Sequence, residues 1–275
     1  MAALRRRRSP SKSPGFSELR LVLLALVGCL RLLPTSVAFQ VNNDHISICR
    51  KATQLDMSSQ QENENARRPW DILRFAQQSS RFVTLPSPFS GSTSKRIVKP
   101  GDVLWKPDSS SMSDNLFKTF APLDDVVMGG ASASQFNDAT GKWTGTVTDA
   151  NNGGFVGIRT TPNALLDMTA CKGIELRLFS NKQQRLKVAL RDSTSFNGIV
   201  WSTSVDMSNG KAIRVPFDKQ VPTLFARIDN TADPFQKDNV TAMQLVYSKF
   251  EYDGALNPKF FAGPVDVQVE EIRAY

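Results

Sequence analysis

Gly173-Ile-Glu-Leu-Arg-Leu178 is the stretch that decides the fold, because apolar and charged residues alternate along its length. A period of two places successive side chains on opposite faces of a β-strand, so one face of this segment is apolar and the other is charged. Residues 186–191 and 213–217 have the same period. The three segments are therefore predicted to be strands that bury one face.

Less regular strand patterns extend from these segments in both directions. In the last pattern, Val265, Val267 and Val269 share one face, and Ile272 returns to that face only if Glu270-Glu271 forms a β-bulge. The additional strands are predicted at residues 116–120, 142–148, 154–160, 200–206, 240–248 and 265–274.

Nine short strands separated by turn residues, without a long helix, predict an all-β fold. We expect an antiparallel β-sandwich or jelly roll over residues 114–275. A domain of this size buries an adequate core without a metal ion or a disulfide. Only Cys171 of the three cysteines lies in it, so no disulfide can form inside the domain, and a reducing compartment fits best.

The net charge of +8 is unevenly distributed along the chain. Residues 1–112 contain 17 Lys and Arg against 8 Asp and Glu, whereas residues 113–275 contain 17 against 18. The basic character therefore belongs to the N-terminal part and not to the predicted domain. A nucleic-acid-binding domain needs a basic surface of its own, so the charge gives no support for RNA as a partner.

The N-terminal part has the features of a targeting region and is expected to be disordered. Basic residues precede Leu21–Leu30, an apolar run too short to span a bilayer, and small residues precede Phe39. We therefore predict a signal peptide at residues 1–38. The polar residues 39–68 are typical of a transit peptide, and the combination resembles the bipartite presequences that direct proteins into secondary plastids. A secretory signal followed by a disordered linker is the alternative.

Residues 69–83 are predicted to form a short amphipathic helix, because the segment begins with a proline and its apolar positions recur at helical spacing. The apolar stripe includes Trp70, Leu73 and Phe75, and it either packs on the domain or docks on a membrane surface or a partner protein. Residues 84–113, rich in proline, serine and lysine, are predicted to be a linker.

Two glycine-rich loops are candidate interaction segments. Neither has the spacing of a P-loop or leads into a helix that could hold a phosphate, so no cofactor is predicted. Asn152-Gly153 is a favourable turn, and we expect it to join residues 142–148 and 154–160 in a hairpin. The loop residues are Met128, Gly129 and Gly130, and Asn152, Gly153 and Gly154.

The predicted domain lacks the side chains of common catalysis. The only histidine, His45, lies in the targeting region, which excludes a Ser-His-Asp triad and a histidine metal site in the domain. Cys171 is expected to be a packed core residue. Paired carboxylates such as Asp124-Asp125 can serve acid–base chemistry or calcium binding, but tying down the following backbone is the better interpretation. We therefore predict no catalytic residue and no metal.

Tryptophans suggest a different kind of binding. In carbohydrate-binding sandwiches such rings stack on sugars, and Trp105, Trp143 and Trp201 are candidates for this role. Trp143 and Trp201 lie in strand patterns, where core packing is the default. A carbohydrate-binding module is therefore an alternative function.

Several segments follow the order seen in one known family. They are Asp125-Val-Val-Met-Gly-Gly130, Trp143-Thr-Gly-Thr-Val147, Asn152-Gly-Gly-Phe-Val-Gly-Ile-Arg159 and Gly263-Pro-Val-Asp-Val-Gln-Val-Glu-Glu-Ile272. The chain resembles the complex I intermediate-associated protein 30 family over roughly residues 70–275, and the Asp-Val-Val-Met-Gly-Gly signature is its most specific piece. The resemblance implies a galactose-binding-like jelly roll and a factor that holds partly built membrane complexes.

On this resemblance we expect a non-enzymatic assembly factor or chaperone. Its partners would be protein subunits or intermediates of a photosystem or an NADH dehydrogenase-type complex, with peripheral contact to a membrane. The expected compartment is a plastid, and a mitochondrial assembly factor for respiratory complex I is the alternative. Asp124, Asp125 and the two glycine loops, together with the helix at Trp70, Leu73 and Phe75, are the candidate interaction sites.

Overall fold

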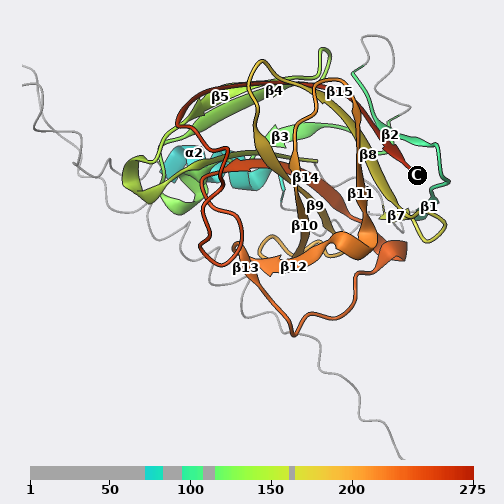
Figure 1. Ribbon diagram of the computed structural model, residues 1–275. Helices are drawn as coiled ribbons and strands as arrows, with labels where there is room; N and C mark the ends of the chain where they lie inside the picture. The colour runs from blue at the N-terminus through green and yellow to red at the C-terminus, as the bar shows by residue number, and fades with distance from the viewer. Residues whose placement is uncertain (1–71, 83–94, 108–114, 161–164) are drawn as a thin grey trace, which may run out of the picture. The chain divides into compact units, whose positions relative to one another are not determined.

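The computed structural model describes residues 72–82, 95–107, 115–160 and 165–275. The targeting segments predicted at residues 1–38 and 39–68, and Trp70 of the predicted helix, lie outside the described residues. In the described part, two antiparallel sheets pack face to face around an apolar core (Figure 1). The predicted all-β sandwich is thereby confirmed. None of the helices in this part is long and apolar enough to span a bilayer.

The first sheet has seven strands in the order β13-β12-β10-β9-β14-β6-β3. Side chains alternate between its faces, so Val188 and Leu245 point into the core while Lys187 and Gln244 point to the outer face. Its strands are β3 (Phe120–Pro122), β6 (Phe155–Thr160), β9 (Arg185–Arg191), β10 (Val200–Asp206), β12 (Val221–Leu224), β13 (Arg227–Ile228) and β14 (Ala242–Ser248).

The second sheet has six strands, with β2 paired to β15 beside the path β11-β8-β15-β5-β4. Its strands are β2 (Val103–Trp105), β4 (Ala133–Asn137), β5 (Lys142–Val147), β8 (Gly173–Phe179), β11 (Ala212–Pro216) and β15 (Gly263–Ala274). A separate parallel pair joins β1 (Lys95–Ile97) to β7 (Leu165–Asp167). Short 3₁₀ turns lie at η2 (Asp125–Met128), η3 (Ala150–Asn152), η4 (Phe217–Lys219) and η5 (Lys237–Asn239).

Strand β15 contains the bulge that the sequence predicts. Val269 pairs with Leu178 and Glu271 pairs with Arg177, so Glu270 is the extra residue. Because the bulge resets the alternation, Ile272 returns to the core face and is fully buried.

The hairpin predicted at Asn152-Gly153 is wrong. Strand β5 lies in the six-stranded sheet and β6 in the seven-stranded sheet, so the segment between them crosses the sandwich. The hairpin partner of β5 is β4. Positive φ angles of 58° occur at Asn151 and Asn152, whereas Gly153 has a φ of −70°. A turn preference is a local property and does not specify which strand pairs with the next one.

Residues 95–107, assigned above to a linker, are folded with the domain, since β1 forms the separate pair with β7 and β2 joins the six-stranded sheet. Strand β2 pairs with β15, and its residues Leu104 and Trp105 are fully buried. The domain therefore begins well before residue 114. The short strands escaped prediction because three-residue segments flanked by proline and lysine show no clear period. The strand predicted at residues 116–120 is displaced as well, since β3 starts only at Phe120.

Candidate functional site

Asp125 anchors the two glycine-rich loops to each other. Its carboxylate is 1% exposed. It accepts hydrogen bonds from the backbone N–H of Ser132 (2.9 Å) and from the Ser132 hydroxyl (2.6 Å). It also accepts the backbone N–H groups of Gly154 (2.8 Å) and Phe155 (3.3 Å), which lie at the start of β6. One carboxylate therefore joins the turn η2 to the segment that crosses between the sheets.

Glycine is required where the loops approach this carboxylate. A Cβ atom at Gly130 or Gly153 would collide with the carboxyl group of Asp125. Met128 is 69% exposed and Asn152 is exposed, so these two predicted residues face away from the centre. The predicted loop residues that meet around Asp125 are Gly130, Gly153 and Gly154.

Asp124 ties helix α2 (Ile72–Ser80) to the sandwich. Its fully buried carboxylate accepts hydrogen bonds from Gln78 (3.1 Å) and Arg74 (3.3 Å) on the helix. From β4 it accepts the backbone N–H (2.8 Å) and hydroxyl (2.6 Å) of Ser134. Gln78 Oε1 in turn accepts the N–H of Asp124 (3.1 Å). Burial raises the pKa of Asp124, against the lowering effect of the hydrogen bonds from Ser134 and Gln78.

Asp124, Asp125 and their hydrogen-bond partners form what we call the carboxylate centre. Every oxygen of the two carboxylates accepts at least one N–H or O–H group, and none is left free to coordinate a cation. Over the described ranges, no group of three His, Cys, Asp or Glu side chains is placed to hold a metal ion. The prediction that the acidic pair ties down the backbone is confirmed.

Helix α2 carries exposed apolar side chains on the side away from the carboxylate centre. Leu73 is 84% exposed and Ile72 is 58% exposed, whereas Phe75 is half-buried. The neighbouring turn η2, which packs against the helix, adds the exposed Met128. We call Ile72, Leu73 and Met128 the apolar ridge. The helix therefore packs on the sandwich through its polar residues Arg74 and Gln78, while Ile72 and Leu73 face solvent. Docking of the apolar side chains on a membrane surface or a partner protein stays a prediction.

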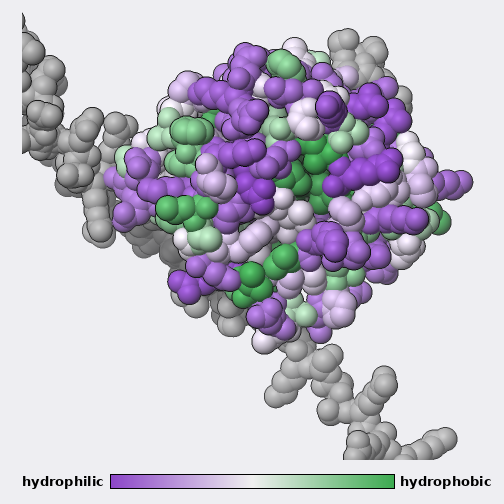
Figure 2. All heavy atoms as spheres, viewed as in Figure 1, coloured by the Kyte–Doolittle hydropathy of each residue, from purple (hydrophilic) through white to green (hydrophobic). Residues whose placement is uncertain are grey.

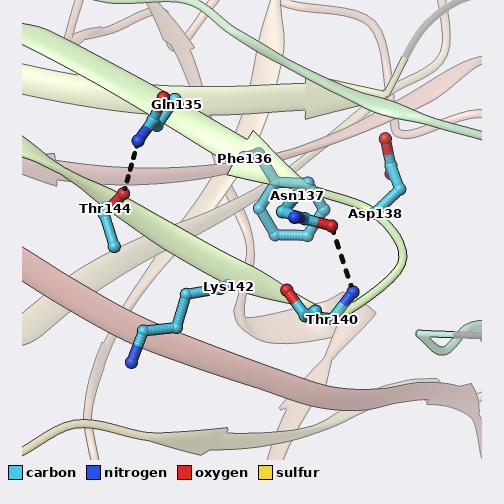
Figure 3. A pocket seen from close by; sticks show the side chains of 7 residues that line it. All are labelled: Gln135, Phe136, Asn137, Asp138, Thr140, Lys142 and Thr144. Atoms are coloured by element: carbon cyan, nitrogen blue, oxygen red, sulfur yellow. Dashed lines mark hydrogen bonds between the residues drawn. The ribbon is translucent and has the colours of Figure 1, made fainter.

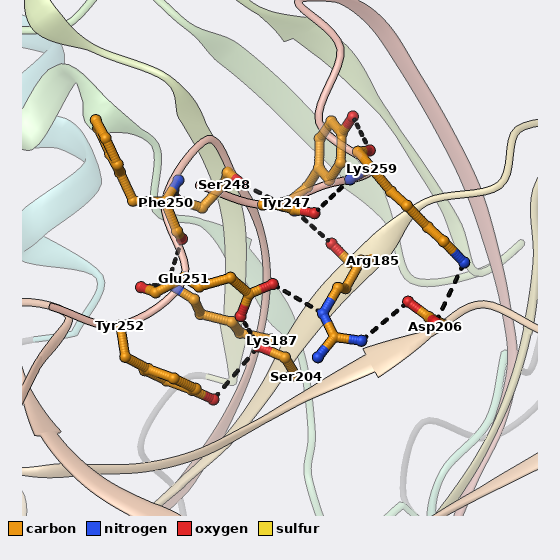
Figure 4. Close-up of polar contacts among 11 residues, drawn as sticks. Arg185, Lys187, Ser204, Asp206, Tyr247, Ser248, Phe250, Glu251, Tyr252 and Lys259 are labelled. Carbon is orange, nitrogen blue, oxygen red and sulfur yellow. Dashed lines mark hydrogen bonds and ion pairs between the residues drawn. The ribbon is translucent and has the colours of Figure 1, made fainter. Parts of the chain in front are cut away.

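The outer face of the seven-stranded sheet carries a charged network (Figure 4). Arg185 forms ion pairs with Glu251 (2.9 Å) and Asp206 (3.1 Å). The ammonium group of Lys187 donates to the carbonyl oxygens of Phe250 (2.5 Å) and Glu251 (2.6 Å). Burial lowers the pKa of Lys187 to about 8, with Glu251 acting in the opposite direction. These contacts fasten the loop after β14 to strands β9 and β10.

A hollow of about 550 Å³ lies beside the β4–β5 hairpin (Figure 3). Its polar side chains are largely engaged with one another or with nearby backbone. Gln135 donates to the Thr144 hydroxyl (3.3 Å), and Asn137 accepts the N–H of Thr140 (3.2 Å). Lys142 pairs with Asp266 (2.7 Å). Asp138 also lines the hollow, and its carboxylate accepts the backbone N–H of Phe120 (3.0 Å).

The three tryptophans are packed inside the domain. Trp105 and Trp143 are fully buried, and Trp201 is 8% exposed with its Nε1 donating to Asp192 (3.1 Å). None of them offers a ring face to a sugar, which removes the observation that suggested carbohydrate binding. Cys171 is buried, and burial raises the pKa of its thiol, so the expected core role is confirmed.

A family model for Complex I intermediate-associated protein 30 (CIA30) matches residues 110–268, more than half of the chain. The chain belongs to this family. The matched region contains both acidic residues and both glycine loops, and it includes the two buried carboxylates of the carboxylate centre. A search of curated proteins by sequence found no match.

Solved structures similar to this CIA30 protein include a family 11 carbohydrate-binding module of a cellulosomal cellulase of Clostridium thermocellum. It has 13% identity and a TM-score of 0.38, covering 57% of this chain and 88% of the module. An agarase has 9% identity and a TM-score of 0.35, and the match covers 61% of this chain and 24% of the agarase. An exo-beta-agarase has 9% identity and a TM-score of 0.34, and the match covers 64% of this chain and 26% of the exo-beta-agarase. The chain thus spans about a quarter of each agarase.

The sequence did not reveal which residues complete the carboxylate centre of this CIA30 protein. Ser132 and Ser134 follow the glycine pair at alternate positions, a spacing that could have marked them as partners on one face of a strand. Nothing in the sequence connects Gln78 or Arg74 to Asp124. Gln78 and Asp124 are 46 residues apart, and only the docking of α2 brings them together.

Proposed function

We propose that this chain is a non-enzymatic assembly factor that binds subunits or partly built intermediates of a membrane-bound electron-transport complex. The observation that carries the proposal is the CIA30 match over residues 110–268. The family name refers to intermediates of complex I, and the proposal extends that association to this chain. Photosystem and NADH dehydrogenase-type complexes are the two client classes.

The apolar ridge is the proposed contact surface for the client. Leu73 and Ile72 lie on a helix of only nine residues, which would be marginal on its own. The hydrogen bonds from Arg74 and Gln78 to Asp124 hold this helix against the sandwich. Because the backbone of the helix is already ordered before binding, less conformational entropy is lost on contact with a client than for a free peptide. Elsewhere, on the face that Figure 2 shows, apolar residues form separate small patches in a mostly hydrophilic surface.

The client test is affinity purification from cross-linked organelle membranes with the wild-type chain and Leu73→Lys. We expect the wild type to recover subunits of one electron-transport complex and Leu73→Lys to recover about tenfold less. Leu256→Lys is the matched control, because Leu256 is 66% exposed on the loop after β14 and is not part of the apolar ridge, so it should not alter recovery.

The two parts of the proposal fail in different ways. If the wild type recovers no electron-transport subunit in repeated experiments, the assembly function is rejected. If Leu73→Lys recovers the same subunits as the wild type, the function stands and the apolar ridge is rejected as its site.

The proposed compartment is a secondary plastid, supported by the apolar run Leu21–Leu30 and the polar segment that follows it. Residues 1–70 fused to a fluorescent protein should label the plastid. Fluorescence in mitochondria would indicate that the client is respiratory complex I. Fluorescence in the culture medium would show that residues 1–70 do not direct the protein to an organelle.

A further inference from the structure

Two buried arginines converge at one end of the seven-stranded sheet. Arg159 on β6 and Arg191 on β9 both lie on the outer face, and β14 runs between their strands. Arg159 is opposite Gln244, and Arg191 is opposite Ala242. The small side chain of Ala242 leaves space for the guanidinium groups to approach each other across about 10 Å of sheet.

Both guanidinium groups are held by neutral partners. Arg159 Nε donates to Gln244 Oε1 (2.6 Å). Its guanidinium carbon lies 5.0 Å from the ring centroid of Phe82 and 5.3 Å from that of Phe196. Arg191 donates to the carbonyl oxygens of Ser195 and Phe196. These contacts orient the two groups and leave their positive charges without a carboxylate partner among the residues that the structure describes.

Two buried positive charges of this kind are energetically expensive. Arg159 is 8% exposed and Arg191 is 3% exposed. Burial, and then the charge of Arg191, lower the pKa of Arg159 to about 9, so it remains charged at neutral pH. Asp192 is the nearby acid that acts on Arg191. Its carboxylate, however, accepts the Nε1–H of Trp201 (3.1 Å) and the N–H of Gln236 (3.0 Å). Asp192 therefore compensates part of the charge without pairing directly with either guanidinium group, and an anion from outside would compensate the positive charge that remains.

The two arginines line a small open hollow. Its volume is about 20 Å³, which is room for one water-sized group such as a single oxygen atom. The other wall is the hydroxyl-rich loop Ser193–Ser195, and the remaining lining residues include two phenylalanines, an alanine and two threonines. The residues that line it with the arginines are Phe82, Thr160, Ser193, Thr194, Ser195, Phe196, Thr241 and Ala242.

We propose that this hollow is a phosphate-binding site, in which an oxygen of a phosphate group enters between Arg159 and Arg191 and the rest of the group stays at the mouth near Ser193–Ser195. Guanidinium groups recognise phosphate through charge-assisted hydrogen bonds, and hydroxyl groups can supply further donors. The phosphate is either free in solution or part of a phospholipid headgroup. The site lies on the sheet and is separate from the apolar ridge, so it does not depend on the proposed client.

The first test compares the melting temperature of the purified full-length chain in inorganic phosphate and in chloride of equal ionic strength. At a phosphate concentration ten times the dissociation constant, we expect the wild type to melt about 3 °C higher in phosphate. The shift should disappear in Arg159→Gln and in Arg191→Gln. It should persist in Arg214→Gln, the matched control, because Arg214 is exposed and ion-paired with Glu175 on the other sheet.

A second readout uses only the wild type, in case the buried arginine variants do not fold. Phosphate should slow hydrogen exchange of the backbone amides in residues 192–198 relative to chloride. The source of the phosphate is separated by flotation with phosphatidylcholine vesicles that contain phosphatidylglycerol. Co-flotation that Arg159→Gln abolishes supports a headgroup, and a phosphate effect without flotation supports a free anion.

Three results would overturn the proposal. The first is that neither the melting temperature nor the hydrogen exchange of residues 192–198 in the wild type differs between phosphate and chloride. The second is an equal shift with acetate, which would indicate a site for carboxylate groups of a peptide. The third is a phosphate shift that both Arg159→Gln and Arg191→Gln retain.

Discussion

Replacing Asp125 by Asn tests whether the carboxylate centre holds the two glycine loops together. The substitution keeps the size of the side chain and changes one oxygen into an NH₂ group. In its best orientation, the remaining oxygen faces Gly154 and the Ser132 hydroxyl, and the NH₂ group faces the backbone N–H of Ser132. That N–H then meets a donor where it had an acceptor.

The cost follows from counting these bonds. Loss of one charge-assisted hydrogen bond in a buried site costs about 2 kcal/mol, and each remaining bond weakens by about 0.7 kcal/mol when its acceptor becomes neutral. Burying a neutral amide in place of a charge offsets part of this sum. We therefore expect Asp125→Asn to lower the free energy of unfolding by about 3 kcal/mol.

Urea denaturation followed by tryptophan fluorescence measures this change, because Trp105 and Trp143 are buried in the core. The control is Asp266→Asn, which removes a half-exposed carboxylate paired with Lys142 and should cost no more than about 1 kcal/mol. If Asp125→Asn costs no more than Asp266→Asn, the carboxylate does not hold the loops and our account of the signature is wrong.

Three other predictions address the domain boundary, a buried lysine and the cysteine. Trp105→Ala should lower the free energy of unfolding, measured by urea denaturation, by about 3–5 kcal/mol, because Trp105 is fully buried in the core. A loss below about 1 kcal/mol would mean that β2 does not belong to the folded domain. Lys187 has a pKa of about 8 in the folded state, whereas an exposed lysine has a pKa of 10.5. As the pH rises, the folded state therefore loses the proton of Lys187 at a lower pH than the unfolded state does. The free energy of unfolding of the wild type should therefore rise between pH 8 and 10.5 by up to about 3 kcal/mol relative to that of Lys187→Met. If the free energies of unfolding of the two proteins change with pH in parallel, this prediction is wrong. Cys171 should resist alkylation in the native chain and react after unfolding, as peptide mass spectrometry can measure; equal rates in both states would place the thiol at the surface.

Strand prediction succeeded where one face of the strand meets the core. Residues 200–206 were predicted as a strand, and β10 has the same bounds. The bulge at Glu270 was also predictable, because Ile272 could reach the core in no other way. Prediction missed β1, β2, β4, β7, β12 and β13. The three residues of β1 and of β2 contain too little alternation to be recognised.

The candidate site was predictable only in part. The Asp124-Asp125 pair and the glycine loops stand out in the sequence, and so does the apolar stripe that includes Leu73. Their arrangement does not, because Asp125 binds Gly154 across 29 residues and Asp124 binds Gln78 across 46. The pairing of Arg159 with Arg191 was likewise invisible, because each residue by itself is one charged position in a strand.

The sequence by itself determined that this chain forms a β-sandwich, which side of residues 173–178, 186–191 and 213–217 faces the core, and that the signature of the CIA30 family is present. These properties follow from the period of apolar residues and from local residue patterns. The tertiary structure alone decided that the segment at Asn152 crosses between sheets, that the acidic pair is buried, and that two arginines share one hollow. Those features arise from contacts between distant segments, and such contacts depend on which strands pair.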